Sequence, residues 1–249
     1  MSETLVIGVA MRNGAASVGH ALTSIFGQEP IRRPVEVLLV DDGSTDAWRP
    51  AVRPFRERPE LRIISTAQGA AWATRNAMIR DVRRRHDGGA YLARLDCDDE
   101  LAGPDVLSDV DELLRRHAPD VLFLGNRLRE NGQLLSRVNR AAPELAEFRH
   151  LDERLAGMAE GDPSSELPSC NTIIRTSVPF EYPSAASAED HWLTVDLLLR
   201  RAELRLHFDE RQLWATYSLS GAVTARNRKG TTYRDSRLAL LGEFRRRTT

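Results

Sequence analysis

Short runs of apolar residues alternate along the chain with longer segments in which apolar residues recur every three or four positions. In the first half, each strand-sized run is followed by a helix-length amphipathic segment, and the connections are short. This alternation predicts an α/β fold built on a mainly parallel, doubly wound sheet. The expected strands are 5–10, 35–40, 61–65, 91–95 and 121–124, and the expected helices are 16–26, 47–58, 70–85 and 104–116.

The second half of the chain has a less regular pattern. A polar hairpin is expected over 126–139, with its turn at Asn131-Gly132, because both residue types tolerate the left-handed backbone of such turns. A segment follows that combines a candidate helix with a loop rich in Gly, Asp, Pro and Ser. The remaining expected elements are strands at 172–175 and 213–219 and helices at 189–201 and 233–247.

Composition and charge narrow the class of protein. The 249 residues, 41% of them hydrophobic and 29% charged, suffice for one or two domains with a sizeable core. Thirty-five basic and 36 acidic residues leave a net charge of -1, which argues against nucleic acid as a partner. No apolar run approaches the roughly 20 residues that span a bilayer, and the sequence has no signal-peptide pattern. We therefore expect a cytoplasmic protein without a transmembrane segment.

The commonest nucleotide-binding motifs are missing from the sequence. The segment after the first expected strand does not form G-x-G-x-x-G, and no G-x-x-x-x-G-K-[ST] occurs. Hydride transfer at a dinucleotide site and phosphoryl transfer at a P-loop therefore lose their main support. Ligands of doubly wound sheets bind beyond the carboxyl ends of the strands, which directs the search to the loops after Ala10, Val40, Ser65 and Leu95.

Acidic residues gather after two of these strands. Residues 41–46 read Asp-Asp-Gly-Ser-Thr-Asp, where a carboxylate could accept hydrogen bonds from a base imide or a ribose hydroxyl. The alternative is an ordinary turn in which Ser44 or Thr45 caps the next helix. Residues 96–100 read Asp-Cys-Asp-Asp-Glu, and two spaced carboxylates there can ligate a divalent ion that bridges diphosphate oxygens. The alternative here is a solvated acidic turn before the helix at 104–116.

A third acidic pair, Glu189-Asp190, begins the expected helix at 189–201. Acidic residues favour the first turn of a helix because they compensate its dipole, so this pair alone does not establish a catalytic role. His191 follows directly, and a surface or capping role fits it as well as a catalytic one. Each acidic group thus keeps a structural alternative when it is taken alone.

Four motifs nevertheless follow one another along the chain in a fixed order. They are Val6-Ile7 with Asn13, Val40 to Asp46, Gly69 with Arg75-Asn76-Ala77, and Leu95 to Asp99. In this order and spacing they resemble family 2 glycosyltransferases of the GT-A fold. The resemblance runs from about residue 4 to 125, resumes over 169–201 and continues more faintly to Thr224.

This resemblance implies an inverting enzyme that moves a sugar from a nucleotide-diphospho-sugar, with a UDP-sugar favoured, to an acceptor hydroxyl. It implies Asp190 as the general base, with Glu189 orienting the acceptor or the base. Asp98 would ligate Mn²⁺ or Mg²⁺, with Asp99 as a substitute ligand. Arg12 stands where the family commonly has an aromatic residue, so a guanidinium would stack on the nucleotide base. The residues implied in nucleotide and diphosphate binding are Ala10, Met11, Arg12, Asn13, Asp42, Arg75, Asp96 and Cys97.

The same resemblance implies a division of the chain. Residues 1–118 would form a nucleotide-sugar-binding half, 119–225 a smaller acceptor-binding and catalytic half, and 226–249 a C-terminal loop and helix. The acceptor would be a glycan, a lipid-linked molecule or a natural product, and a homo-oligomer is left open. Two alternatives remain: a catalytically silent protein of the GT-A fold that binds nucleotide or glycan, and a nucleotidyltransferase, in which Asp190 would lack a role.

Two features qualify this interpretation. The stretch 216–224 lacks the His that some family members use as a metal ligand. Either the ion would bind weakly without nucleotide, or diphosphate and water would complete its coordination. The basic residues from Arg226 to Lys229 form either a solvated loop or a lid that closes over the donor diphosphate.

Overall fold

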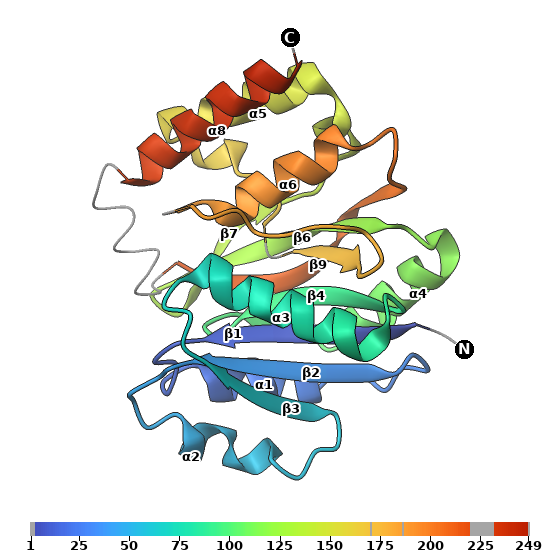
Figure 1. Cartoon of the computed structure of the whole chain (residues 1–249), viewed down its shortest axis with the longest axis vertical. Coiled ribbons are helices and arrows are strands. Elements are labelled where there is room, and N and C mark those ends of the chain that lie inside the picture. Colours follow the sequence, from blue (N-terminus) through green and yellow to red (C-terminus); the bar gives the residue numbers. More distant parts are fainter. Residues whose placement is uncertain (1–2, 170, 186, 220–231, 249) are drawn as a thin grey trace.

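The computed structural model describes residues 3–169, 171–185, 187–219 and 232–248, which form a sheet flanked by helices (Figure 1). The strands are β1 (Thr4–Met11), β2 (Val35–Asp42), β3 (Leu61–Thr66), β4 (Ala90–Asp96), β5 (Glu100–Leu101), β6 (Val121–Glu130), β7 (Gln133–Asn139), β8 (Thr172–Arg175) and β9 (Leu206–Ser218). The helices are α1 (Val18–Phe26), α2 (Arg49–Val52), α3 (Ala71–His86), α4 (Val106–His117), α5 (Phe148–Glu160), α6 (Glu189–Leu199) and α8 (Thr232–Thr248). Short 3-10 turns occupy Arg53–Phe55, Pro143–Ala146 and Pro163–Ser165.

The nine strands form one sheet in the order β3-β2-β1-β4-β8-β6-β9-β5, with β7 paired to β6. Strands β1 to β4 are parallel to one another. Strand β8 runs antiparallel to both of its neighbours, β4 and β6, and β6 is parallel to β9. The prediction of an α/β fold with a mainly parallel sheet is confirmed. Because β8 lies between β4 and β6, the sheet continues without a break across residue 118.

Apolar layers cover both faces of the sheet. Helices α3, α5, α6 and α8 contribute to one layer, and α1, α2 and α4 to the other. In strand β2, Val37 and Leu39 belong to one layer, and Leu38 and Val40 belong to the other. The sequence of β2 is almost continuously apolar because the strand is covered on both faces. The two faces therefore hold the parallel strands in register and fix where their carboxyl ends lie.

Most expected elements are present, with three differences of note. The hairpin turns at Asn131 and Gly132, with φ of 50° and 81°, as predicted. The expected helix at 47–58 is reduced to α2 and a 3-10 turn, because Pro54 interrupts it and a proline inside a helix removes a hydrogen bond. Strand β9 begins at Leu206 rather than at 213, and β5 was not expected, because both depend on pairing with distant strands.

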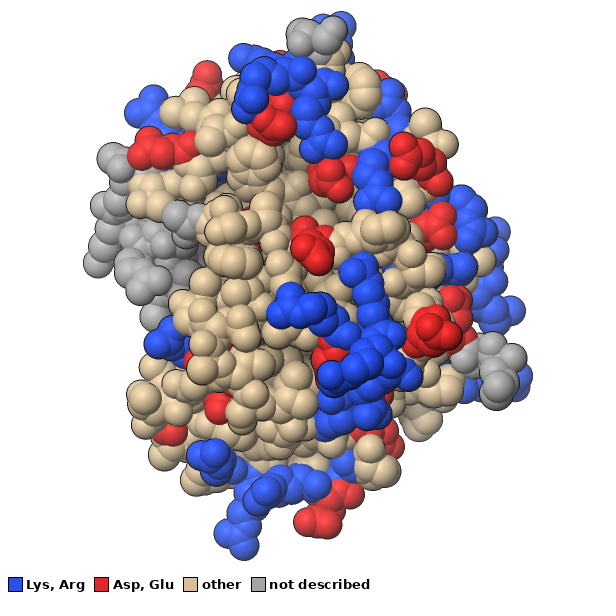
Figure 2. Space-filling model, viewed as in Figure 1, with Lys and Arg blue, Asp and Glu red and all other residues tan. Residues whose placement is uncertain are grey.

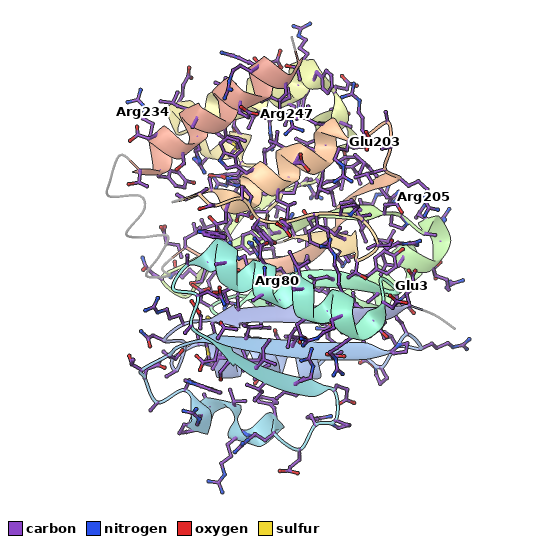
Figure 3. The ribbon with its side chains drawn as sticks, viewed as in Figure 1. Glu3, Arg80, Glu203, Arg205, Arg234 and Arg247 are labelled. Atoms are coloured by element: carbon purple, nitrogen blue, oxygen red, sulfur yellow. The ribbon has the colours of Figure 1, made fainter. Side chains whose placement is uncertain are left out.

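On the face shown in Figure 2, basic side chains gather over the region of α3. The exposed residues of this helix include Arg80, Arg84 and Arg85, and Arg80 is labelled in Figure 3. Acidic partners are interspersed, since Asp81 forms ion pairs with both Arg62 and Arg84.

Among the described helices, none combines the length and the apolar character needed to cross a membrane.

Candidate active site

The carboxyl ends of β1 and β2 lie side by side, and their loops are joined by hydrogen bonds. The backbone N–H of Asn13 donates to Ser44 Oγ (2.8 Å), and the backbone N–H of Thr45 donates to Asn13 Oδ1 (2.8 Å). Asn13 adopts φ of 56°, a conformation that Asn tolerates better than most residues. The Met11 side chain is buried, so this position can offer only backbone groups to a ligand at the strand tip.

Asp42, at the end of β2, holds the loop that leads from β3 to α3. It is buried, and its Oδ1 accepts hydrogen bonds from the Gln68 backbone N–H (2.6 Å) and the Thr66 hydroxyl (3.1 Å). Its Oδ2 accepts from the backbone N–H of Gly69 (3.0 Å). The exposed Arg12 reaches the same loop, with Nη1 3.5 Å from the Gly69 carbonyl oxygen. Asp42 and Arg12, two of the residues predicted to bind the nucleotide, therefore contact the same loop.

A chain of alternating charges lies where α3, β4 and α6 meet. Arg75 of α3 forms ion pairs with Glu189 and with Asp96, the latter at 3.3 Å. Arg94 of β4 forms ion pairs with Asp96 (3.4 Å) and with Asp190 (3.2 Å). Both arginine side chains are buried, at 10% and 4% exposure. The order Glu189, Arg75, Asp96, Arg94, Asp190 connects the expected diphosphate site to the expected base.

The electrostatics of this network keep the carboxylates of Asp190 and Asp96 ionised. Burial alone would raise the pKa of Asp190, but His191, Arg94 and Arg75 hold the pKa of that carboxyl well below its usual range. Burial likewise opposes ionisation of Asp96, and the two arginines lower the pKa of Asp96. Buried charges of this kind persist only when opposite charges compensate them. Asp190 is thus an ionised carboxylate held beside Arg94.

Two residues of this site, Arg94 and Tyr182, were not predicted from the sequence. Both arginine side chains lie over the ring of Tyr182, with 5.5 Å from Arg75 and 5.7 Å from Arg94 to the ring centroid. Asn76 holds the Tyr182 backbone in place, because its side-chain amide donates one 2.8 Å hydrogen bond to that backbone and accepts another of 2.8 Å from it. The signal for Arg94 was present in the sequence: it is a charged residue inside the otherwise apolar run at 91–95.

The acidic turn after β4 divides its carboxylates between two environments. Asp98 is exposed, and partial desolvation together with the neighbouring Asp96 raises the pKa of Asp98 to about 6. Asp99 is buried and accepts a 2.8 Å hydrogen bond from the backbone N–H of Ser218 on β9. Burial, with Asp96 and Asp98 nearby, raises the pKa of Asp99 well above its usual value. Asp98 is therefore placed to meet a ligand, whereas Asp99 fastens the turn to β9.

The residues of this turn suit a divalent cation only in part. Carboxylate oxygens are the ligands that Mg²⁺ and Mn²⁺ prefer, and Asp98 presents one to solvent. Within the described ranges, no group of three or more His, Cys, Asp or Glu side chains is arranged to hold a metal ion. Cys97 is a poor ligand here, since burial and the flanking Asp98 and Asp96 raise the pKa of its thiol to about 12. The donor set fits an ion that also takes oxygens from a bound diphosphate.

One predicted element cannot be placed. The basic stretch from Arg226 to Lys229, predicted as either a solvated loop or a lid, lies outside the described residues.

Comparison with known proteins relates this geometry to established families. Residues 6–178 match the family model described as Glycosyl transferase family 2. Among curated proteins, no relative matches the sequence.

Two solved structures illustrate the likeness of the fold. S. aureus TarS 1–349 in complex with UDP-GlcNAc is 20% identical with a TM-score of 0.63, and the match covers 88% of this chain and 58% of that one. The mannosyltransferase PcManGT from Pyrobaculum calidifontis in complex with GDP-Man and Mn²⁺ is 15% identical with a TM-score of 0.64, covering 96% of this chain and 64% of that one. The chain thus spans about three fifths of the length of these structures and shares their fold.

Proposed function

The chain belongs to glycosyl transferase family 2 and has the GT-A fold, and from this premise we propose that it transfers a sugar from a nucleotide-diphospho-sugar to an acceptor hydroxyl. The observation that carries the proposal is the charge network that joins Asp96 and Asp190 through Arg94. It brings the predicted diphosphate site and the predicted base into one cluster, although they come from different halves of the chain. We assign residues 1–118 to donor binding and 119–225 to acceptor binding and catalysis.

A UDP-sugar is the proposed donor. The similar structures contain UDP-GlcNAc in one case and GDP-Man in the other, so the fold alone does not select the base. An ionised carboxylate offers about four lone-pair positions, and those of Asp42 already accept three hydrogen bonds from the loop at 66–69. One position remains, which suits the single imide N–H of uracil better than the two adjacent donors of guanine.

The metal and the diphosphate are assigned to the acidic turn. Asp98 would hold Mn²⁺ or Mg²⁺ together with diphosphate oxygens, and the bound ion would stabilise the negative charge of the leaving diphosphate. Asp96 would help to hold this arrangement in place, because ion pairs with Arg75 and Arg94 already fix the position of its carboxylate. Asp99 would contribute by keeping the turn attached to β9.

Asp190 is the proposed general base. Its carboxylate would take the proton of the acceptor hydroxyl while that oxygen forms a bond to the anomeric carbon. The bond from this carbon to the diphosphate breaks on the opposite face, so the configuration inverts. A base works best with a pKa near the working pH, whereas Arg94 helps to hold the pKa of Asp190 far lower. We therefore expect Arg94 to turn towards the donor diphosphate when donor binds, which would make Asp190 more basic.

Thermal unfolding with UDP, GDP and dTDP, each with and without Mn²⁺, tests the donor assignment. A ligand that binds the folded state raises the melting temperature by mass action. We expect the largest rise with UDP and Mn²⁺ together. If none of the nucleotides changes the melting temperature, the donor site proposed here is wrong.

Cleavage of UDP-sugars distinguishes an enzyme from a silent binding protein. The Asp190→Asn variant should bind UDP but lose turnover. Glu203→Gln is the control, because Glu203 follows the same helix closely in the chain and its side chain is 74% exposed. Equal turnover in the wild type and in Asp190→Asn would contradict the base assignment.

A further inference from the structure

His191 is buried beside the proposed base rather than at the surface. Its side chain is 9% exposed, and its Nε2 lies 3.5 Å from Glu166 Oε2. Its Nδ1 is buried and has no hydrogen-bond partner among the described residues. A buried polar atom without a partner is costly and calls for an explanation. His191 thus lies between Asp190, which precedes it on α6, and the carboxylate of Glu166.

Two side chains of the C-terminal helix α8 donate hydrogen bonds to the Glu166 carboxylate. Arg237 Nη2 donates to Glu166 Oε1 at 2.6 Å, and the Tyr233 hydroxyl donates to the same oxygen at 3.0 Å. Arg237 is buried, and its guanidinium lies over the Tyr233 ring, 3.5 Å from the centroid. By contrast, Arg234 and Arg247, near the two ends of α8, are exposed (Figure 3). One face of α8 therefore meets Glu166.

Glu166 is itself held in place from α5. Arg154 of that helix donates to the backbone carbonyl oxygens of Ser164 (2.8 Å) and Glu166 (2.7 Å). Helices α5, α6 and α8 lie together in one part of the molecule (Figure 1), and their apolar residues share one core. The position of the Glu166 backbone is thus fixed independently of His191 and of α8.

We propose that Glu166 is a positioning residue of the active site, which holds His191 and with it the first turn of α6, and that α8 completes this support through Arg237 and Tyr233. The proposal rests on the assignment of Asp190 as the base. It makes the base dependent on α8 through the hydrogen bonds of Tyr233 and Arg237 to Glu166.

Glu166→Gln in the full chain tests this role. The substitution keeps the shape of the side chain and removes its charge. Asp152→Asn is the matched control, because Asp152 also joins α5 to α8, through a 2.7 Å ion pair with Arg245. Three quantities are compared: the imidazole ¹⁵N signals of His191, the rise in melting temperature with UDP and Mn²⁺, and the kcat and KM for UDP-sugar cleavage.

We expect Glu166→Gln to move the His191 imidazole signals and to lower kcat by about tenfold through misplacement of the base. The KM for donor and the response to UDP should stay as in the wild type, and Asp152→Asn should change none of these quantities. If the His191 signals and kcat of Glu166→Gln equal those of the wild type, the proposal is overturned.

Two further results keep the test decisive. If Glu166→Gln does not fold, Tyr233→Phe replaces it, since this variant loses only the hydroxyl; unchanged His191 signals in it would overturn the role of α8. A wild-type protein that cleaves no UDP-sugar would defeat the proposed function. In that case shifted His191 signals in Glu166→Gln would still support the contact between Glu166 and His191, so the two failures are distinguishable.

Discussion

The two sides of the site are held together in different ways. On the donor side, Asp42 and Asn13 are fixed mainly by hydrogen bonds to backbone N–H groups of neighbouring loops. On the catalytic side, Asp190 and Glu189 are fixed by ion pairs with buried arginines of other elements. The backbone N–H donors of these bonds do not titrate and belong to the chain itself, so no second charged side chain is needed. Ion pairs instead make each carboxylate dependent on the charge of its partner.

This difference predicts which property each side controls. A neutral substitution on the donor side should weaken nucleotide binding, whereas one on the catalytic side should impair chemistry and stability. The following experiments challenge this division in order of decreasing expected effect.

The largest effect is expected from Asp190→Asn. Loss of a general base lowers the rate by about 10²–10⁴-fold, so kcat should fall by that factor while the KM for donor changes little. Asp42→Asn should do the reverse, with a higher KM and a nearly unchanged kcat. Steady-state kinetics of UDP-sugar cleavage on both variants give the answer. A higher KM in Asp190→Asn with an unchanged kcat would remove the distinction between the two sides.

Arg94→Met should cause the largest loss of stability. The substitution leaves the half-buried carboxylates of Asp96 and Asp190 without this partner. Breaking a fully buried pair costs about 3–5 kcal/mol, so we expect a loss at the lower end of that range. On the donor side, Ser44→Ala removes a hydrogen bond from the Asn13 backbone N–H and should cost about 1 kcal/mol. Urea unfolding measures both free energies. Equal losses in the two variants would mean that the ion pairs do not dominate the catalytic side.

The same contrast explains how much of the molecule could be predicted from its sequence. The strand tips, the hairpin at Asn131-Gly132 and the acidic turns follow from local patterns, because turn chemistry and periodicity act over a few residues. The pairing of Arg94 with Asp190 joins residues 96 positions apart, and no local pattern reports which buried arginine meets which acid. The length of β9 was missed for the same reason, since distant pairing with β6 extends it.

Asp98→Asn tests the proposed metal ligand, which lies on the acidic turn after β4. In the wild type, UDP at a hundredfold excess over its Kd adds about 2.7 kcal/mol of stability, and we expect part of this gain to need Mn²⁺. The variant should lose the part that depends on Mn²⁺ and keep the rest. Asp105→Asn is a control at an exposed acid nearby. An undiminished Mn²⁺-dependent rise in melting temperature in Asp98→Asn would refute the ligand assignment.

The raised pKa of Asp98, about 6, predicts how this variant responds to pH. An acid whose pKa is higher in the folded than in the unfolded state favours folding below its unfolded pKa, near 4. That contribution is lost as the pH rises towards 6. Without ligands, Asp98→Asn should therefore melt at a higher temperature than the wild type at pH 7 and at a similar one at pH 4. A difference of the same size at both pH values would contradict this.

The smallest effect concerns backbone strain on the two sides. Ala188, just before α6, has φ of 62°, and Asn13 has φ of 56°. Ala is penalised in this region, so Ala188→Gly should stabilise the protein by about 0.5–1 kcal/mol. Asn13→Gly should destabilise it, because the Asn13 side chain accepts a hydrogen bond from Thr45. Thermal unfolding measures the two signs, and a loss of stability in Ala188→Gly would show that Ala188 is not strained.

The place of β8 in the sheet has a consequence for protein engineering. In a chimera joined at residue 118, the second parent would have to supply the strand that pairs with β4 on the side away from β1, because here that strand is Thr172–Arg175. A mismatch at this seam would leave one edge of β4 unpaired. Open edges of sheets invite aggregation. The two halves are therefore interlocked rather than modular, and a designer who seeks a new acceptor should graft loops onto the intact sheet instead of exchanging halves.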